Sequence, residues 1–316
     1  MRAIALVLLA VLANGLRFGF QGMRSSKALL GQGGSGRGSP IFATAAVSPV
    51  QLSLIPTAQT PPSALALLLP GITLFQEALL FNGLWLALLS ASKQKSLTRS
   101  GLVHATVLGV GLWSFLGLQG WLVCVAYLIM GSLVTKVKMK EKEALGIAEK
   151  RGGARGPENV WGAAATAMMC ALLTGVLPAF AEPLLVGYVA SLTTKLSDTF
   201  GSEIGKAYGK TTYLSTTFKR VPPGTEGAVS LEGTLAGVGG SLLLVAVARL
   251  LNVLPPGAPA AVSCVVAAFV ATTAESIIGA TFQSTVPWLT NELVNLVNTL
   301  IGAAVGVALF CFWPMR

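Results

Sequence analysis

Residues 195 to 210 read KLSDTFGSEIGKAYGK and concentrate charged side chains in a chain that has few of them. Asp198 is the only aspartate among 316 residues, and Glu203 follows it closely. Lys195, Lys206 and Lys210 flank these two carboxylates. Carboxylate oxygens suit Mg²⁺, and lysine ammonium groups suit phosphate oxygens. The stretch therefore predicts a site for a metal ion and a phosphorylated ligand.

The spacing within this stretch allows two interpretations. Glycines recur every fourth position from 201 to 209, which would let a bulky phosphate approach the backbone. On a continuing helix Thr194, Asp198 and Ser202 would share one face and offer hard oxygen ligands. The alternative is that the glycines form a small-residue face for helix packing and that the charges form a solvated helix end.

Two connecting segments predict further contacts to anions. Residues 211 to 237, TTYLSTTFKRVPPGTEGAVSLEGTLAG, contain Lys219, Arg220 and Glu226 just before an apolar run. Residues 149 to 162, EKRGGARGPENVWG, place Arg151 and Arg155 among glycines before another run. Unpaired backbone N–H groups at a helix start favour anions, so both segments are candidates for phosphate contacts. A solvated basic loop remains the alternative for the second segment.

Composition indicates an integral membrane protein. Hydrophobic residues make up 53% of the chain, charged residues 11%, and the mean hydropathy is +0.72, whereas soluble domains hold about 25% charged residues. Inside lipid a spanning segment must satisfy its own backbone, so long apolar runs form helices. We expect an all-α, polytopic protein with about seven to eight transmembrane helices. The predicted spans are 64–90, 101–117, 119–135, 159–180, 183–197, 231–253, 259–282 and 288–313.

The loop charges predict an orientation for these spans. The net charge is +10, and nearly all loop Lys and Arg fall in the connections 91–100, 136–158 and 198–230, which lie on one side. The connections at 118, 181–182 and 254–258 lie on the other side and have none. This asymmetry follows the positive-inside rule, so the basic residues indicate membrane orientation and not a nucleic-acid partner. The basic side is expected to be cytosolic or, after plastid import, stromal.

The same topology brings polar residues from distant parts of the chain to the basic face. Glu275 lies near the end of the seventh span, and Asn291, Glu292 and Asn295 lie at the start of the eighth. Asn291, Asn295 and Asn298 would form one stripe on that helix, which could instead join helices by hydrogen bonds. A carboxylate at membrane depth is a candidate functional group. The convergence therefore predicts a site at this face.

Several absences narrow the chemistry. His104 lies in an apolar span and is expected to be a packed or hydrogen-bonded core residue, and the four cysteines lie singly in apolar runs. The sequence has no P-loop motif and no aspartate-rich motif. Phosphoryl transfer onto an existing phosphate fits this inventory, because the acceptor oxygen is already largely ionised near neutral pH (second pKa about 6). Such catalysis requires positioning and charge neutralisation.

The N-terminal region differs from the remainder. No acidic residue precedes Glu77, and residues 31 to 40, GQGGSGRGSP, are too rich in Gly and Ser to hold a fold. Basic, acid-free and Ser-containing N-termini are typical of organellar targeting segments. We therefore expect residues 1–60 to be a targeting and disordered segment, with a disordered tail as the alternative, and residues 62–316 to form the membrane domain.

Long motifs carry a family resemblance over roughly residues 62 to 316. TKLSDTFGSEIGKAYGKTTYLSTTFKRVPPGTEGAVSLEGTLAG, GSLVTKVKMKEKEALGIAEKRGGARGPENVWG, AESIIGATFQ and WLTNELVNLVNTLIGA closely resemble the transmembrane-protein-19-like family, in its plant and algal phytyl-phosphate kinase branch. The resemblance implies a multi-pass kinase of the chloroplast membrane, with its active face on the stroma. Its implied reaction converts phytyl phosphate to phytyl diphosphate for tocopherol (vitamin E) and phylloquinone synthesis. The implied donor is CTP first and another nucleoside triphosphate second, with Mg²⁺ as cofactor.

Chemistry and motif position together assign candidate roles. The catalytic candidates are Asp198, Glu203, Glu226 and Lys195. The metal candidates are Asp198, Glu203, Glu232, Glu275, Asn291 and Asn295. The nucleotide or phosphate candidates are Lys136, Arg155, Asn159, Ser202, Lys206, Lys210, Lys219 and Arg220.

Two other functions remain open at the level of sequence. One is a kinase for another isoprenoid phosphate, with a geranylgeranyl or farnesyl chain. The other is a membrane transporter of an anion or small metabolite, which intramembrane carboxylates and Gly-rich helices would also suit. We find no convincing repeat between the two halves of the chain, which argues against a transporter. The sequence does not fix the oligomeric state.

Overall fold

The apolar runs form helices, as a chain that must satisfy its backbone inside lipid requires. The computed structural model describes residues 73–92, 94, 96–283 and 285–313, so the predicted targeting segment and the start of the first predicted span lie outside the described residues. The all-α prediction is confirmed, because the two strands found are two residues long each. The elements are α3 (Leu74–Ala91), α4 (Arg99–Thr135), α5 (Met139–Ala144), η1 (Lys150–Gly153), α6 (Pro157–Val176), η2 (Pro178–Phe180), α7 (Ala181–Tyr208), β1 (Tyr213–Leu214), β2 (Ala228–Val229), α8 (Leu231–Leu250), α9 (Ala258–Ile278), the π-helical η3 (Gly279–Gln283) and α10 (Asn291–Cys311).

α4 is a hairpin of two helices that meet at Gly117. This residue has φ 65° and ψ −168°, a non-helical conformation that glycine adopts at little cost. The rings of Trp113 and Trp121, on either side of the break, lie 5.7 Å apart between centroids. Gly101 and Gly131, near opposite ends of α4, both pack against Arg155. The chain therefore reverses direction, which confirms the two predicted spans 101–117 and 119–135.

The predicted count of seven to eight transmembrane helices is compatible with the structure. Within the described residues, six helices are long and apolar enough to cross a membrane, and α4 supplies two crossings among them. α7 does not meet the apolar criterion because it carries charged residues, but its 28 residues extend over about 42 Å. The bundle thus has eight segments that could cross a bilayer.

One predicted boundary is wrong. The fifth span was expected to end at residue 197, with Asp198 and Glu203 in the following loop, but α7 continues to Tyr208. The glycines at 201 and 205 do not end the helix, because they pack against α8. A Cβ built on Gly233 of α8 would lie 2.5 Å from the Gly201 carbonyl oxygen and 3.2 Å from the Gly205 Cα. These contacts favour the helix-packing interpretation of the glycine repeat.

α7 positions the other helices. It packs against α4, α6, α8, α9 and α10, and Val186, Tyr188, Val189 and Leu192 in its middle are completely buried. Two helices that start at the basic end, α4 and α8, have side-chain caps: Thr98 accepts from Gly101 N at 2.9 Å, and Ser230 accepts from Gly233 N at 3.1 Å. Caps of this kind satisfy N–H groups that have no partner in the helix.

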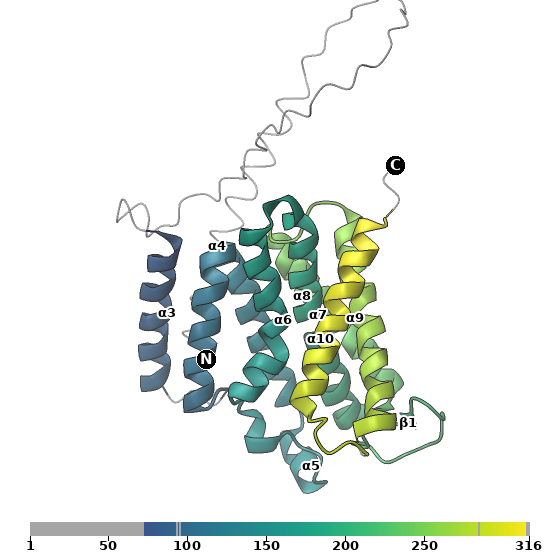
Figure 1. Ribbon diagram of the computed structural model, residues 1–316. Coiled ribbons are helices and arrows are strands. Elements are labelled where there is room, and N and C mark those ends of the chain that lie inside the picture. Colours follow the sequence, from purple (N-terminus) through teal and green to yellow (C-terminus); the bar gives the residue numbers. More distant parts are fainter. Residues whose placement is uncertain (1–72, 93, 95, 284, 314–316) are drawn as a thin grey trace, which may run out of the picture. The chain divides into compact units, whose positions relative to one another are not determined.

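The basic connections meet at one end of the bundle, as the topology predicts. Figure 1 shows α5 and β1 at the same end. Thr98 N donates to the Arg155 carbonyl at 3.0 Å, and Ser215 Oγ donates to the Ser276 carbonyl at 3.0 Å. One basic side chain lies at the other end: Arg249 donates to the carbonyl groups of Pro255 and Gly257. These hydrogen bonds hold the turn between α8 and α9.

Candidate active site

Five polar side chains from three helices form a cluster near the basic end of the bundle. This central cluster consists of Lys195 and Asp198 on α7, Glu275 on α9, and Asn295 and Asn298 on α10. Lys195 Nζ donates to Asp198 Oδ2 and, at 2.6 Å, to Asn295 Oδ1. Asn298 Nδ2 donates to Glu275 Oε2, and the carboxyl groups of Asp198 and Glu275 lie within hydrogen-bonding reach of each other.

The central cluster is largely shielded from solvent. The Lys195 and Asp198 side chains are 12% and 21% exposed. Among the described residues, the buried Asn298 Oδ1 and Thr194 Oγ1 have no hydrogen-bond partner. Buried polar oxygens are costly unless they are paired. Thr194 packs against Gly302, whereas Asn298 contacts Glu275 within the central cluster, so its Oδ1 is the atom available to a ligand.

Local helix geometry explains this arrangement. Lys195 and Asp198 are three residues apart and therefore neighbours on one face of α7. The predicted Asn stripe of α10 is divided: Asn295 and Asn298 enter the cluster, whereas Asn291 accepts from Gln283 Nε2 nearer the helix start. The sequence placed Asn298 in the Asn stripe but did not identify it as a ligand. Its neighbour Glu275 lies 23 residues earlier in the chain, and such a tertiary contact is not visible in the local sequence.

The donor set partly fits the predicted Mg²⁺. Two carboxylates and unpaired buried oxygens are the hard ligands that Mg²⁺ prefers, although Lys195 already neutralises part of the charge. Within the described residues, no three His, Cys, Asp or Glu side chains form a ready-made metal cluster. A metal in this site would therefore require amide oxygens, water or substrate oxygens in addition to Asp198 and Glu275.

Glu203 lies apart from the central cluster, in a second buried charge pair. Its carboxylate accepts from Lys142 Nζ of α5, and Lys206 Nζ lies 3.6 Å away. Lys142 Nζ also donates to the Thr135 carbonyl at 2.8 Å. The exposures of Glu203 and Lys142 are 2% and 1%. This pair joins the basic segment after α4 to α7.

Arg155 and Asn159 line a pocket beside the central cluster. Arg155 Nη1 donates to Tyr127 Oη at 2.6 Å, and the guanidinium lies over the Tyr127 ring. Tyr127 in turn is close enough to Lys195 to interact with its charge. Asn159 is bonded to Arg151 and Gly156, and lies 3.4 Å from Glu292. Tyr127 gave no sequence signal, because it is an aromatic residue in an apolar run.

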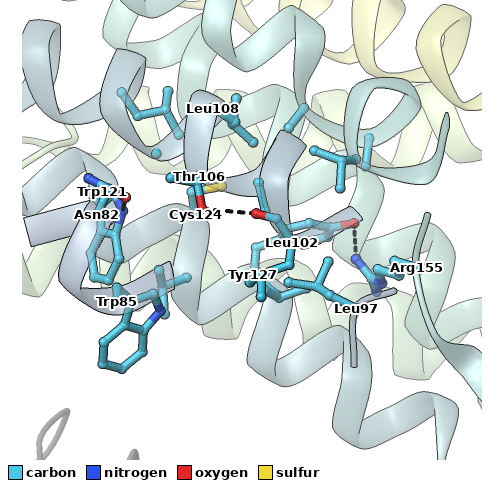
Figure 2. Close-up of a pocket in the computed structure, with 18 of the residues that line it drawn as sticks. Asn82, Trp85, Leu97, Leu102, Thr106, Leu108, Trp121, Cys124, Tyr127 and Arg155 are labelled. Atoms are coloured by element: carbon cyan, nitrogen blue, oxygen red, sulfur yellow. Dashed lines mark hydrogen bonds between the residues drawn. The ribbon is translucent and has the colours of Figure 1, made fainter. Parts of the chain in front are cut away.

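The pocket extends from Arg155 between α3, α4 and α6. Figure 2 shows Arg155 and Tyr127 bonded to each other on one side and Asn82, Trp85 and Trp121 on the other. Trp121 Nε1 donates to Asn82 Oδ1 at 3.0 Å, so its polar atom is satisfied. Most of the lining between these groups is aliphatic, and the space is about 710 Å³ when the solvent-filled region at its opening is included.

The remaining phosphate candidates lie on the surface of the basic end. Lys136, Ser202, Lys210, Lys219 and Arg220 are exposed, and Lys206 is partly exposed. Glu226 is exposed in the 209–230 connection and near Glu275, and Glu232 lies in the first turn of α8. Among these residues, Lys206 interacts with the charge of Asp198 and Glu226 with that of Glu275.

The residues expected to be inert agree with those expectations. His104 Nδ1 accepts from Trp161 Nε1 at 2.9 Å, which makes it a hydrogen-bonded core residue. Cys124, Cys170, Cys264 and Cys311 are free thiols. Neither kind of residue contributes to the central cluster.

The fold and the buried charged cluster define a multi-pass membrane protein with a polar site at one end. Residues 83–303 match the family described as Integral membrane protein DUF92. The match covers more than half of the chain, so the chain belongs to this family.

Three relatives support the assignment. An uncharacterized membrane protein of Synechocystis is 52% identical over 237 residues, which are 74% of this chain and 90% of that protein. Protein VTE6, chloroplastic, of Arabidopsis thaliana is 49% identical over 216 residues, 67% of this chain and 64% of that protein. An uncharacterized membrane protein of Methanocaldococcus jannaschii is 32% identical over 232 residues, 71% of this chain and 90% of that protein. The expected family resemblance is thus confirmed. No solved structure matches the chain.

Proposed function

We propose that this protein is a membrane-bound kinase that converts phytyl phosphate to phytyl diphosphate with a nucleoside triphosphate, CTP first. The observation that carries the proposal is a buried cluster of Lys195, two carboxylates and two amides next to an apolar pocket headed by Arg155. The 49% identity to VTE6 supports a role in tocopherol synthesis. The pocket suits an isoprenoid chain, and the cluster suits phosphates.

The proposed chemistry needs no protein base. A phosphate acceptor is largely ionised near neutral pH (second pKa about 6), so the protein must hold two anionic groups together and neutralise them. In this proposal Lys195 contacts the transferred phosphoryl group and Arg155 contacts the acceptor phosphate. Their positive charges reduce the repulsion between donor and acceptor.

Mg²⁺ is proposed as the cofactor. Asp198, Glu275 and the free Oδ1 of Asn298 would hold it, with Asn295 adjacent. When bound, Mg²⁺ would neutralise the triphosphate and stabilise charge in the transition state. Glu203, Glu232 and Asn291 lie outside this set and are weaker candidates. The exposed residues Lys136, Lys210, Lys219 and Arg220 and the partly exposed Lys206 would attract the nucleotide to the basic end.

The proposed location is the chloroplast membrane, with the basic end in the stroma. The name of VTE6 and the positive-inside distribution support it. The Synechocystis relative indicates that the fold also serves in a bacterial membrane. Phytyl diphosphate from this reaction would supply tocopherol and phylloquinone synthesis.

Product formation by purified protein tests the proposal. The protein is incubated with Mg²⁺, phytyl phosphate and each nucleoside triphosphate in turn, and phytyl diphosphate is measured by mass spectrometry. Asp198→Asn should lower turnover about 100-fold or more, because it removes a charge from the central cluster. Glu182→Gln, at the other end of α7 and exposed, should leave turnover unchanged.

The outcomes separate the alternatives. Diphosphate formed by the wild type and lost in Asp198→Asn would establish the kinase and identify its donor. Formation only from geranylgeranyl or farnesyl phosphate would reassign the lipid. If folded protein forms no diphosphate from any isoprenoid phosphate and nucleotide, the kinase proposal is refuted and transport becomes the function to measure.

A further inference from the structure

We propose that the pocket between α3, α4 and α6 is the binding site for the apolar chain of an isoprenoid monophosphate, with Arg155 at its phosphate. The inference rests on the proposed function and adds the location of the lipid. It commits to one occupant because the pocket combines a cationic group at one end with aliphatic and aromatic walls. A lipid with one anionic end has the complementary distribution of charge.

Arg155 has the properties of a phosphate ligand. Among the described residues its side chain makes one hydrogen bond, to Tyr127, and pairs with no carboxylate. A guanidinium has five N–H donors, so several remain for an anion. The absence of a side chain at Gly131 makes room for the group, since a Cβ there would lie 2.6 Å from Arg155 Nη2. Backbone bonds at 3.0 Å with Ser96 and Thr98 fix the residue.

The apolar part of the pocket extends away from Arg155 along α4. Trp121, at the far end, precedes Gly131 by ten residues on one half of the hairpin, which corresponds to about 15 Å. Leu102, Leu108 and Leu112 line the pocket from the other half, and Ala163 from α6. Phe81, Trp113 and Trp121 pack ring against ring near the far end. These rings would limit the length of chain that fits.

Tyr127 lines the pocket and is also close to the central cluster. Tyr127 interacts with both Arg155 and the charge of Lys195. A phosphate held by Arg155 would therefore lie near Lys195 while its apolar chain stays among α3, α4 and α6. With this arrangement one enzyme would bind a long apolar chain in the pocket and a highly charged donor at the central cluster.

Photoaffinity labelling tests the location without turnover. Purified wild-type protein in nanodiscs, with no nucleotide, is irradiated with a phytyl phosphate analogue that carries a diazirine at the end of its chain, and labelled peptides are mapped. We expect labels around Leu112 and Trp121, and excess phytyl phosphate should compete. Labels confined to other helices, or labels that phytyl phosphate does not reduce, would overturn the inference.

Matched variants separate pocket filling from general damage. Ala105→Phe places bulk in the pocket and should weaken labelling and raise KM for phytyl phosphate roughly tenfold. Val107→Phe, two residues away and 57% exposed, is the control and should change neither. Equal effects of the two variants would contradict the proposal. Wild-type mapping remains decisive if a variant fails to fold.

A second pair tests Arg155. Arg155→Gln should reduce the preference for phytyl phosphate over phytol as competitor about tenfold, as loss of a charged hydrogen bond predicts. Arg99→Gln, exposed at the same end, should keep the preference. An unchanged preference in Arg155→Gln would overturn its role.

The lipid site and the kinase function can fail separately. Labelling of the pocket without diphosphate formation would refute the proposed kinase function but not the lipid site. Diphosphate formation with labels on other helices would refute the lipid site but not the kinase function.

Discussion

At the scale of single residues, the Lys142–Glu203 pair makes a prediction about stability. Both side chains are buried, and without Lys142 the Glu203 carboxylate would keep only the longer contact to Lys206, at 3.6 Å. Because removal of one partner from a buried ion pair costs about 3–5 kcal/mol when no other charge compensates, Lys142→Met should lower the stability by up to that cost and with it the thermal unfolding temperature. The double variant Lys142→Met with Glu203→Leu should recover part of the loss, because no poorly neutralised carboxylate remains. Thermal unfolding of both variants in detergent checks this. Equal stability of Lys142→Met and wild type would show that the pair is not a structural contact.

The chemistry of the site was predictable in kind but not in its partners. The lone Asp198, the intramembrane Glu275 and the Asn stripe are visible in sequence because such residues are expensive in a membrane. The choice of Glu275 and Asn295 as neighbours of α7 depends on helix rotation, which local sequence does not determine. Glu203 is also a carboxylate and lies five residues after Asp198 in the same stretch. Its partner Lys142 lies 61 positions away, so its separate environment was not predictable.

At the scale of elements, the contact of α7 with α8 predicts opposite effects for two glycines of α8. Gly233→Ala should destabilise by roughly 1–3 kcal/mol, because the new methyl would press on the Gly201 carbonyl. Gly239→Ala meets nothing within 4 Å and should be neutral or stabilise by up to about 1 kcal/mol, because alanine favours helix. Thermal unfolding of the two variants side by side measures the difference. Equal destabilisation would mean that the close approach is not at Gly233.

The limits of helices show what sequence patterns can determine. The apolar runs located most spans, including the two spans 101–117 and 119–135 on either side of the break in α4. The end of α7 was missed, because charges and glycines at 198–209 are typical of a loop. The helix continues there since α8 packs closely against Gly201 and Gly205, and α5 supplies a buried cation for Glu203. Both causes are tertiary contacts that the local pattern does not contain.

At the scale of the whole molecule, the hairpin in α4 decides the topology. A continuous α4 of 37 residues would extend over about 56 Å and carry its two ends to opposite sides of the membrane. The reversal at Gly117 instead returns Lys136 to the side of Thr98. The membrane side of every later connection follows from the side on which Lys136 lies. The basic connections then share one side, which the positive-inside rule requires.

Cysteine accessibility tests this topology. In a variant without the four native cysteines, single cysteines replace Ser100, Lys136, Lys219 or Pro256, all exposed. A membrane-impermeant maleimide is applied to sealed vesicles before and after permeabilisation. The first three positions should react from one side, because both ends of α4 and the 209–230 connection lie at the basic end. Position 256 should react from the other side. Reaction of positions 100 and 136 from opposite sides would require α4 to cross only once, and Thr98 could then not lie on the same side of the membrane as Arg155, to which it is hydrogen-bonded.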